Sequence, residues 1–211
     1  VRGNEIALVP QSVNYLDPLM KVGKQVRGTE RSKHALQRQR ELFLSYGLQE
    51  ETEDLYPFEC SGGMSRRILL STALMGNTRL LIADEPTTAL DVTIQAQILE
   101  LMQDLQKKLG MAIIMVTHDL GVIASMCDEI IVMYGGRVCE RGTADDIFYR
   151  PCHEYTKGLL RSIPRKDNMN ERLVPIGGTP INLLNMPKGC AFCPRCEAAM
   201  KICLDEVPQE I

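Results

Sequence analysis

The stretch Leu80-Leu81-Ile82-Ala83-Asp84-Glu85-Pro86 decides the fold of this chain. Four consecutive apolar residues are typical of a strand that is buried on both faces of a parallel sheet. Two carboxylates follow the strand directly, and ligands of open α/β sheets bind beyond the carboxyl ends of the strands. Taken alone, Asp84 and Glu85 could equally begin a solvated loop. The neighbouring segments must therefore show whether these two carboxylates belong to a ligand site or to a solvated loop.

Helices and apolar strands alternate on both sides of this stretch. Ile94, Ile98, Leu101, Leu105 and Leu109 recur at helical spacing, and Gly110 is a typical helix end. We expect buried strands at 112–116 and at 130–134, the latter turning at Gly135-Gly136. Strand, helix, strand, helix and strand in succession predict an α/β domain with a mostly parallel sheet.

Further elements are expected on either side of this core. The strand 5–9 is ended by Pro10, a charged helix covers 32–46, and another helix runs from Gly62-Gly63 to about residue 75. Thr143-Ala144-Asp145-Asp146 is a capping-box variant, and a further helix covers 154–162. Residues 163–189 are rich in Pro, Gly and Asn, which indicates an extended connection.

Composition excludes some functions for the 211 residues. With 45% hydrophobic and 24% charged residues the chain has ordinary globular composition. A net charge of −3 and 5% aromatic residues without Trp argue against a nucleic-acid partner. No apolar run approaches the roughly 20 residues that span a bilayer. The start at Val1 shows no Met and no signal-peptide pattern, so we expect a fragment.

Three further motifs surround the two carboxylates. Ser61-Gly62-Gly63-Met64 opens a helix, whose free N–H groups and positive end suit a phosphate. Thr88-Ala89-Leu90-Asp91 lies downstream, and Thr117-His118-Asp119 follows the next strand. Each motif alone has an ordinary structural explanation. In a nucleotide hydrolase, however, the first carboxylate of the pair holds Mg²⁺ and the second polarises the attacking water.

The order and spacing of these motifs resemble the ATPase domains of ABC transporters. The resemblance makes residues 61–64 the signature motif, residues 80–85 the Walker B strand and Ala89-Leu90-Asp91 the D-loop. It implies that Glu85 is the catalytic base, His118 the switch histidine and Gln11 the Q-loop glutamine. ATP and Mg²⁺ are the implied cofactors, with Asp84 on Mg²⁺ and with Gln11, Ser61, Gly62, Gly63, Asp84 and Asp91 around the nucleotide.

A narrower resemblance covers almost the whole chain. Residues 84–98, 15–20 and 153–156, together with the Cys-rich end, are similar to the ATPases of dipeptide, oligopeptide and nickel importers. Cys60 and Ser65-Arg66-Arg67 depart from the usual pattern around the signature motif. No Gly-x-x-x-x-Gly-Lys-Ser/Thr loop occurs, and the resemblance implies that this Walker A loop lies ahead of Val1. We expect truncation at the N-terminus, with the chain also stopping early at its C-terminus.

Cys190, Cys193, Cys196 and Cys203 crowd into fourteen positions, a spacing that lets thiolates converge on one centre. The first three resemble the ferredoxin-type Cys-x2-Cys-x2-Cys run. The family resemblance implies a 4Fe-4S cluster, zinc held by four thiolates is the competing interpretation, and reduced thiols without metal are the third. Cys193 stands outside the usual family pattern and could be an extra thiol.

The expected fold class is therefore a P-loop NTPase-like α/β domain with a helical subdomain, lacking its N-terminal strands and Walker A, with a Cys-rich extension. We expect a partial ATPase domain at 1–150, its helical subdomain at about 19–75, and the extension at 151–211. The resemblance implies a second ATPase subunit, identical or sister, and transmembrane permease subunits. It places the protein at the cytoplasmic face of the membrane as a peripheral subunit of a peptide or nickel importer.

Two rival functions remain open. One is a soluble ABC ATPase that acts in DNA repair or translation without any coupling to transport. The other is a metal-binding interaction module with no hydrolytic activity, which is what we expect of the 211 residues taken alone.

Overall fold

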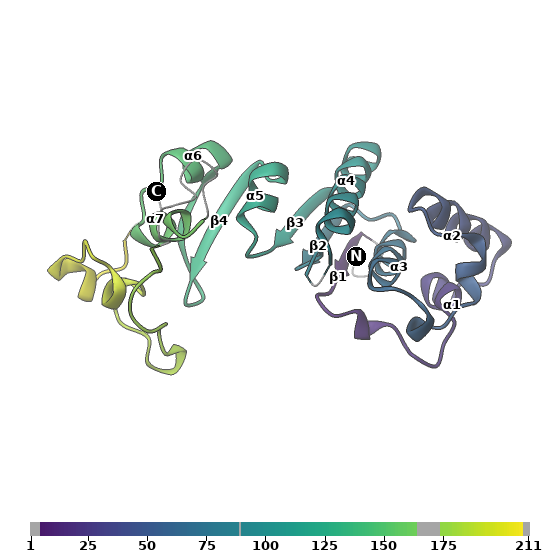
Figure 1. Cartoon of the computed structure of the whole chain (residues 1–211), viewed down its shortest axis with the longest axis horizontal. Coiled ribbons are helices and arrows are strands. Elements are labelled where there is room, and N and C mark those ends of the chain that lie inside the picture. Colours follow the sequence, from purple (N-terminus) through teal and green to yellow (C-terminus); the bar gives the residue numbers. More distant parts are fainter. Residues whose placement is uncertain (1–4, 89, 164–173, 209–211) are drawn as a thin grey trace. The chain divides into compact units, whose positions relative to one another are not determined.

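The computed structural model describes residues 5–88, 90–163 and 174–208. It divides into two compact units, residues 1–122 and residues 123–211. Figure 1 shows both units, each of which is described here by itself. Ala89 of the expected D-loop and residues 164–173 of the expected connection lie outside the described residues.

The first unit is built on a three-stranded parallel sheet (Figure 1). Its strands are β1 (Ile6–Val9), β2 (Leu80–Asp84) and β3 (Ala112–Val116), in the spatial order β1-β2-β3. Leu80 of β2 is in register with Ile6 on one side and Ala112 on the other. Because all three strands run the same way, the segments that follow them emerge at one edge of the sheet.

Two helices connect these strands, and the side chain of the residue before each helix caps its N-terminus. In α3 (Gly62–Leu74) the Ser61 hydroxyl accepts a hydrogen bond from the N–H of Met64. In α4 (Val92–Leu109) the Asp91 carboxylate accepts from the N–H groups of Thr93 and Ile94. Helix α4 ends at Gly110 with a φ of 61°, as predicted.

A helical lobe is inserted between β1 and β2. It holds α1 (Val22–Arg27) and α2 (Lys33–Ser45), which Figure 1 shows on the side of α3 that is away from the sheet. Phe43 and Val22 are completely buried in this lobe. Arg40 donates to the Glu53 carboxylate, and this ion pair holds α2 against the segment 50–54.

The second unit contains a hairpin and short helices. Strands β4 (Glu129–Tyr134) and β5 (Arg137–Thr143) pair antiparallel around Gly135 and Gly136, which have φ values of 58° and 77°. Helices α6 (Ala144–Tyr149) and α7 (Glu154–Arg161) follow, and α6 opens with the predicted capping box of Thr143 and Asp146. Helix α5 (Leu120–Met126) contains the point where the two units are divided.

The two strand predictions at 130–134 and 112–116 need correction. Residues 130–134 lie in an antiparallel hairpin, not in the parallel sheet, and Ile131 and Met133 are each 55% exposed. Strand β3 is a sheet edge whose Ile114 and Val116 are each 51% exposed. An apolar run specifies a strand but not its partner or its coverage, which depend on residues far away in sequence.

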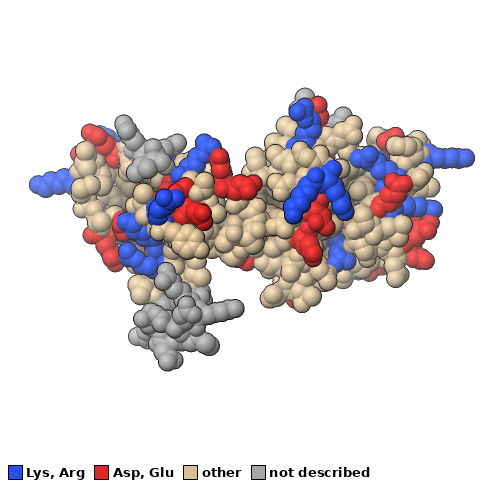
Figure 2. Space-filling view, turned by 90° about the horizontal axis from the view of Figure 1, so that it is seen from above, with Lys and Arg blue, Asp and Glu red and all other residues tan. Residues whose placement is uncertain are grey.

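The surface of the described residues carries both charge signs. On the face in Figure 2, Lys and Arg side chains are interspersed with Asp and Glu, in line with the net charge of −3. None of the helices among the described residues has the length and apolar character needed to cross a bilayer.

Candidate active site

The carboxyl edge of the parallel sheet gathers the segments that the sequence singled out. Pro10 and Gln11 follow β1, Glu85 follows β2, and Thr117 and His118 follow β3. The backbone N–H of Glu85 donates to the carbonyl of Val116 over 2.8 Å. This bond extends the pairing of β2 and β3 by one residue and holds Glu85 beside His118.

The Glu85 carboxylate is held at both oxygens. Its Oε1 accepts hydrogen bonds from Nδ1 of His118 at 2.6 Å and from the His118 backbone N–H at 3.1 Å. Its Oε2 accepts from the Thr88 hydroxyl at 2.9 Å. The Glu85 side chain is only 14% exposed, whereas that of His118 is 83% exposed. The pair thus presents an open imidazole and a fixed carboxylate.

Glu85 has a φ of 47°, the only positive φ at a non-glycine residue among those described. A non-glycine side chain in this left-handed region costs about 1–3 kcal/mol, and such residues cluster at functional sites. The turn that imposes this conformation is closed by the Thr88 N–H, which donates to the Glu85 carbonyl at 3.2 Å. The strained turn and the Thr88 hydroxyl together aim the carboxylate.

The contact between Glu85 and His118 shifts the pKa values of both side chains. Burial raises the pKa of Glu85, but the hydrogen bonds and charge of His118 and the Thr88 hydroxyl outweigh it, so its pKa is lowered. The hydrogen bond and charge of Glu85 raise the pKa of His118. Each member of the pair therefore stabilises the charged form of the other.

Asp84 ends β2 and is partly buried. Among residues 5–88, 90–163 and 174–208 the Asp84 carboxylate has no hydrogen-bond or ion-pair partner. Carboxylate oxygens that are free at the end of a sheet strand suit a hard divalent cation such as Mg²⁺. The position and chemistry of Asp84 thus fit the expected metal role.

The residues expected in the signature motif lie against the start of α4. A Cβ placed on Gly63 would come within 3.1 Å of the Ile94 side chain, and one on Gly62 would contact Leu90 at 3.8 Å. The glycines therefore allow the N-terminus of α3 to approach α4 closely. Within the described residues no hydrogen bond links Ser61, Gly62 or Gly63 to Asp84 or Glu85. Asp91 acts here as the cap of α4.

Gln11 is exposed, and its backbone is tied to α3. The Arg66 guanidinium donates to the carbonyl of Pro10 at 2.7 Å and also to the carbonyl of Gln11. The departure Ser65-Arg66-Arg67 noted in the sequence thus has a structural role that residue patterns did not indicate.

The Cys-rich segment is closed at its base by backbone hydrogen bonds. The N–H of Gly189 donates to the Leu204 carbonyl at 3.1 Å, and the N–H of Cys190 donates to the Cys203 carbonyl at 2.9 Å. A Cβ on Gly189 would lie 2.3 Å from the Cys203 carbonyl oxygen, so only glycine fits. This closure brings the first and last of the four cysteines next to each other.

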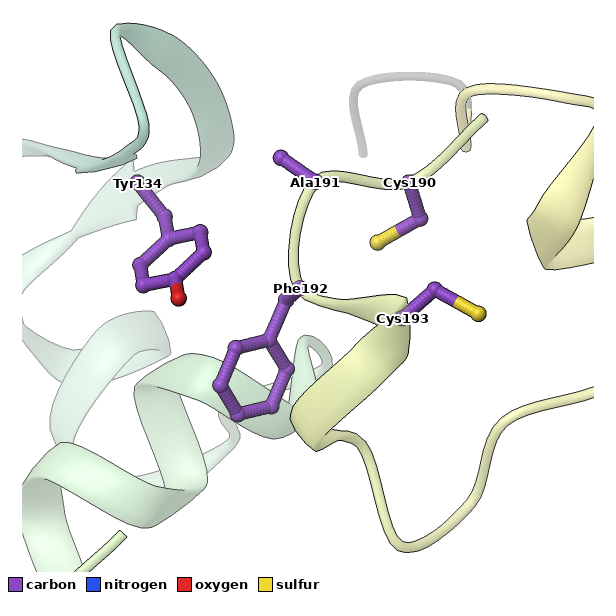
Figure 3. Packing of buried hydrophobic residues seen from close by; sticks show 5 residues of the cluster. All are labelled: Tyr134, Cys190, Ala191, Phe192 and Cys193. Atoms are coloured by element: carbon purple, nitrogen blue, oxygen red, sulfur yellow. The ribbon is translucent and has the colours of Figure 1, made fainter. Parts of the chain in front are cut away.

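Aromatic packing holds this segment to the hairpin. Figure 3 shows Phe192 facing Tyr134, and their rings lie 5.3 Å apart in an edge-on arrangement. Phe192 also contacts Tyr155, and Arg195 lies 5.9 Å above the Phe192 and Tyr134 rings. The segment is therefore anchored by apolar and cation–π contacts.

The backbone brings Cys190 and Cys203 together, but the four thiols do not converge on one centre. In the view of Figure 3 the sulfur atoms of Cys190 and Cys193 point in different directions. No group of three or more His, Cys, Asp or Glu side chains within the described ranges could hold a metal ion. As arranged here, the four cysteines do not fit a 4Fe-4S cluster or a zinc site.

Two residues that hold the Glu85–His118 region in place were not predicted from sequence. Thr88 stands in a motif that the sequence highlighted, but its hydrogen bond to Glu85 depends on the strained turn. Asp119 accepts from Gln95 at 3.0 Å and from the N–H groups of Gly121 and Val122. Asp119 thereby fixes the loop after β3 that carries His118. A carboxylate one residue after the histidine was the available signal.

The fold, the strand-end carboxylates and the histidine beside them define the class of ABC-type ATPase cassettes. The structure resembles the dimeric bacterial ABC transporter cassette MJ0796 with a TM-score of 0.60 and 28% identity, covering 68% of this chain and 64% of that one. It also resembles cbiO1 of Clostridium perfringens, part of the ABC transporter complex cbiONQ, with a TM-score of 0.61 and 28% identity over 69% and 60% of the two chains.

The chain belongs, more narrowly, to the family of oligopeptide and dipeptide transport ATP-binding proteins. The ABC transporter family matches residues 1–88, and the family "Oligopeptide/dipeptide transporter, C-terminal region" matches residues 139–203. The chain is 50% identical to the oligopeptide transport ATP-binding protein OppD of Bacillus subtilis, over 99% of this chain and 61% of that protein. It is 46% identical to the dipeptide transport ATP-binding protein DppD of the same organism, over 96% and 63%.

The chain is also 53% identical to OppD of Escherichia coli over 74% of this chain and 46% of that protein. It spans between 46% and 63% of the length of these three relatives. The resemblance to oligopeptide and dipeptide transport ATPases drawn from the motifs is thus confirmed, as is the α/β cassette fold.

Proposed function

We propose that the protein is the ATP-hydrolysing subunit of a peptide importer, with Glu85 at the centre of the reaction. The observation that carries this proposal is the Glu85 carboxylate, which is held between His118 and Thr88 at the end of β2. Family membership supports hydrolysis of ATP, and the geometry supplies a carboxylate aimed from the sheet edge where nucleotides bind in open α/β folds.

Glu85 orients the attacking water. A water oxygen forms a bond to the γ-phosphorus while the bond to the β,γ-bridging oxygen breaks, and the water's proton passes to Glu85 or to the released phosphate. The lowered pKa of Glu85 makes it a weak base, and a loose phosphoryl-transfer transition state needs orientation more than strong proton abstraction. Asp84 would hold Mg²⁺, which when bound neutralises charge on the β- and γ-phosphates.

His118 connects this carboxylate to the nucleotide. Its Nδ1 carries a proton, because the Glu85 oxygen it contacts is an acceptor. The Nε2 atom can therefore donate to a γ-phosphate only when the imidazole is protonated. The raised pKa of His118 favours that state, and its exposed ring leaves room for the phosphate.

The remaining site residues serve an assembly. By the resemblance to ABC ATPases we assign Ser61, Gly62 and Gly63, at the start of α3, to the nucleotide of a second ATPase subunit. Gln11 would contact this chain's own nucleotide and pass its state to the permease. Asp91 supports the same interface by holding the start of α4. The partner subunit is identical or a sister subunit.

The cargo is proposed as peptide, because the relatives' names concern oligopeptides and dipeptides. Nickel is the competing cargo from the motif resemblance. The proposed location is the cytoplasmic face of the membrane, bound peripherally through the permease. Uptake of labelled dipeptide and of radioactive nickel, compared in cells with and without the gene, separates these cargoes. Uptake of neither would favour an ATPase that is not coupled to transport.

Substitution of Glu85→Gln in the protein expressed from its full reading frame tests the hydrolytic role. We expect turnover to fall by about 10²–10⁴-fold while ATP binding is retained, because only the orienting carboxylate is lost. Steady-state phosphate release and a nucleotide-binding titration provide the two measurements.

Glu129→Gln is the matched control, since Glu129 is an exposed carboxylate paired with Arg141 on β5. Its turnover should equal that of the unaltered protein. Unchanged turnover in Glu85→Gln would remove Glu85 from the mechanism. Absence of any ATPase activity in the unaltered protein would overturn the proposed function.

We propose separately that Cys190, Cys193, Cys196 and Cys203 can take up a 4Fe-4S cluster or zinc. Their spacing and the closure of the segment between Gly189 and Leu204 support this, but the side chains would have to turn. Elemental analysis and the visible absorption spectrum of anaerobically purified protein distinguish iron–sulfur, zinc and free thiols. Protein without iron or zinc would contradict this proposal.

The division into an ATPase domain at 1–150 and an extension at 151–211 also remains a proposal. Limited proteolysis with identification of the cut sites would locate the boundary.

A further inference from the structure

Arg66 is a buried cation that the proposed chemistry does not use. It lies in the second turn of α3 and is 4% exposed. One guanidinium nitrogen donates to the Pro10 carbonyl at 2.7 Å and another donates to the Gln11 carbonyl. These bonds join residues more than fifty positions apart in the sequence, across the first unit.

The charge of Arg66 has no acidic partner in the part of the chain that the structure describes. Burial lowers the pKa of Arg66 below its ordinary value. A buried charge without a counter-ion is costly, so the two carbonyl oxygens must supply most of its stabilisation. Loss of either bond would leave the guanidinium poorly solvated, and the contact therefore resists being opened.

The neighbouring Arg67 shows how different this arrangement is. Its guanidinium donates to the side-chain oxygen of Gln97 on α4 at 2.7 Å, in an exposed contact. Arg67 thus links two helix surfaces, whereas Arg66 reaches the main chain of the segment between β1 and the helical lobe. Because Arg66 binds main-chain carbonyls, its hydrogen bonds depend on the position of the backbone and not on the rotamer of another side chain.

We propose that Arg66 is a positioning residue that fixes the backbone at Pro10–Gln11 to helix α3. Ser61, Gly62 and Gly63 form the beginning of that same helix. A shift of Gln11 therefore moves the N-terminus of α3 with it. Given the proposed function, on which this consequence rests, the clamp links the residue facing this chain's nucleotide to the residues facing the partner's nucleotide.

The clamp itself is tested on the 211-residue chain without nucleotide. Arg66→Met keeps much of the side chain's apolar volume but removes both donors, and Arg67→Met is the control on the same helix. In Arg66→Met we expect amide hydrogen exchange at Asn14 and Leu16, whose N–H groups donate to Ser12 and Val13, to be at least roughly tenfold faster. Arg67→Met should leave these rates unchanged. Arg66→Lys should restore protection in part, because an ammonium group lacks the two-pronged fork.

Equal exchange rates at Asn14 and Leu16 in Arg66→Met and the unaltered chain would overturn the clamp. If Arg66→Met does not fold, Arg66→Gln, which retains one donor group, takes its place in the same comparison. Full protection in that variant would equally overturn the clamp.

The second arm uses the protein from the full reading frame and asks what the clamp does for turnover. Arg66→Met should raise the KM for MgATP several-fold and lower kcat, with partial rescue of both by Arg66→Lys. A loss of folded protein alone would lower the apparent kcat and leave KM unchanged. Faster exchange with normal kinetics would support the clamp but overturn its proposed effect on the nucleotide cycle. Absence of ATPase activity in every variant would refute the proposed function and leave the clamp standing.

Discussion

The edge of the parallel sheet and the Cys-rich segment are organised in opposite ways. At the sheet edge, hydrogen bonds fix individual polar atoms: both oxygens of Glu85 have donors. In the Cys-rich segment, backbone bonds and aromatic packing fix the chain, but within the described residues the four sulfur atoms do not converge, and Cys190 Sγ lies 3.7 Å from Nε2 of His153. The comparison teaches that the backbone of a site can be fixed while its functional atoms are not yet arranged. Of these two described regions, the sheet edge is the one with a preorganised side chain.

The largest effect should come from removing the aromatic anchor of the Cys-rich segment. Phe192→Ala deletes a buried ring that contacts Tyr134 and Tyr155. We expect a loss of about 3–5 kcal/mol in the stability of this segment. Hydrogen exchange of residues 189–204 measures it. Phe58→Ala serves as the control, because Phe58 is 74% exposed. Unchanged exchange would mean that packing does not hold the segment.

A smaller effect is expected from the hydroxyl beside the carboxylate. Thr88→Val removes the donor to Glu85 Oε2, and a hydrogen bond to a charged group contributes about 1.5–3 kcal/mol. If half or more of this acts on the transition state, turnover falls roughly tenfold. Phosphate release from the full-length protein is the measurement, with exposed Thr93→Val on α4 as control. Turnover equal in both variants would show that the Thr88 hydroxyl does not position the carboxylate.

The smallest effect is the pH response of the His118–Glu85 pair, since His118 is largely exposed. Because folding raises the pKa of His118, its contribution to stability is complete below the ordinary pKa and is lost as pH rises through the raised value. The lowered pKa of Glu85 gives a contribution that is lost as pH falls through that lowered value. Titration of the His118 ring by NMR should show a lower pKa in Glu85→Gln than in the unaltered chain. Identical titration curves would contradict the pairing.

Local features of the site were predictable from sequence. The strand before Asp84, the caps at Ser61 and Asp91 and the helix end at Gly110 depend on a few adjacent residues. The contact of Glu85 with His118 spans 33 positions. Knowing that parallel strands end at one edge predicts that these side chains approach, but not which atoms meet.

Other features could not be predicted because they depend on distant partners. Nothing near Arg66 in sequence indicates that it reaches Pro10 and Gln11. The strand at 130–134 has the apolar texture of a sheet interior, yet it pairs with the chain that follows its own turn. The cysteine spacing permits several ligand geometries, and rotamers decide among them.

The left-handed backbone at Glu85 has a consequence for engineering this protein. Asn and Gly adopt a φ near 47° with less strain than Glu does. A screen that rewards survival at high temperature would therefore favour replacements at position 85 that, given the role proposed for Glu85, leave a more stable protein without turnover. Melting temperature alone is therefore a misleading guide to improved variants of this protein. The residue at position 85 should be sequenced in each variant that is selected for heat resistance.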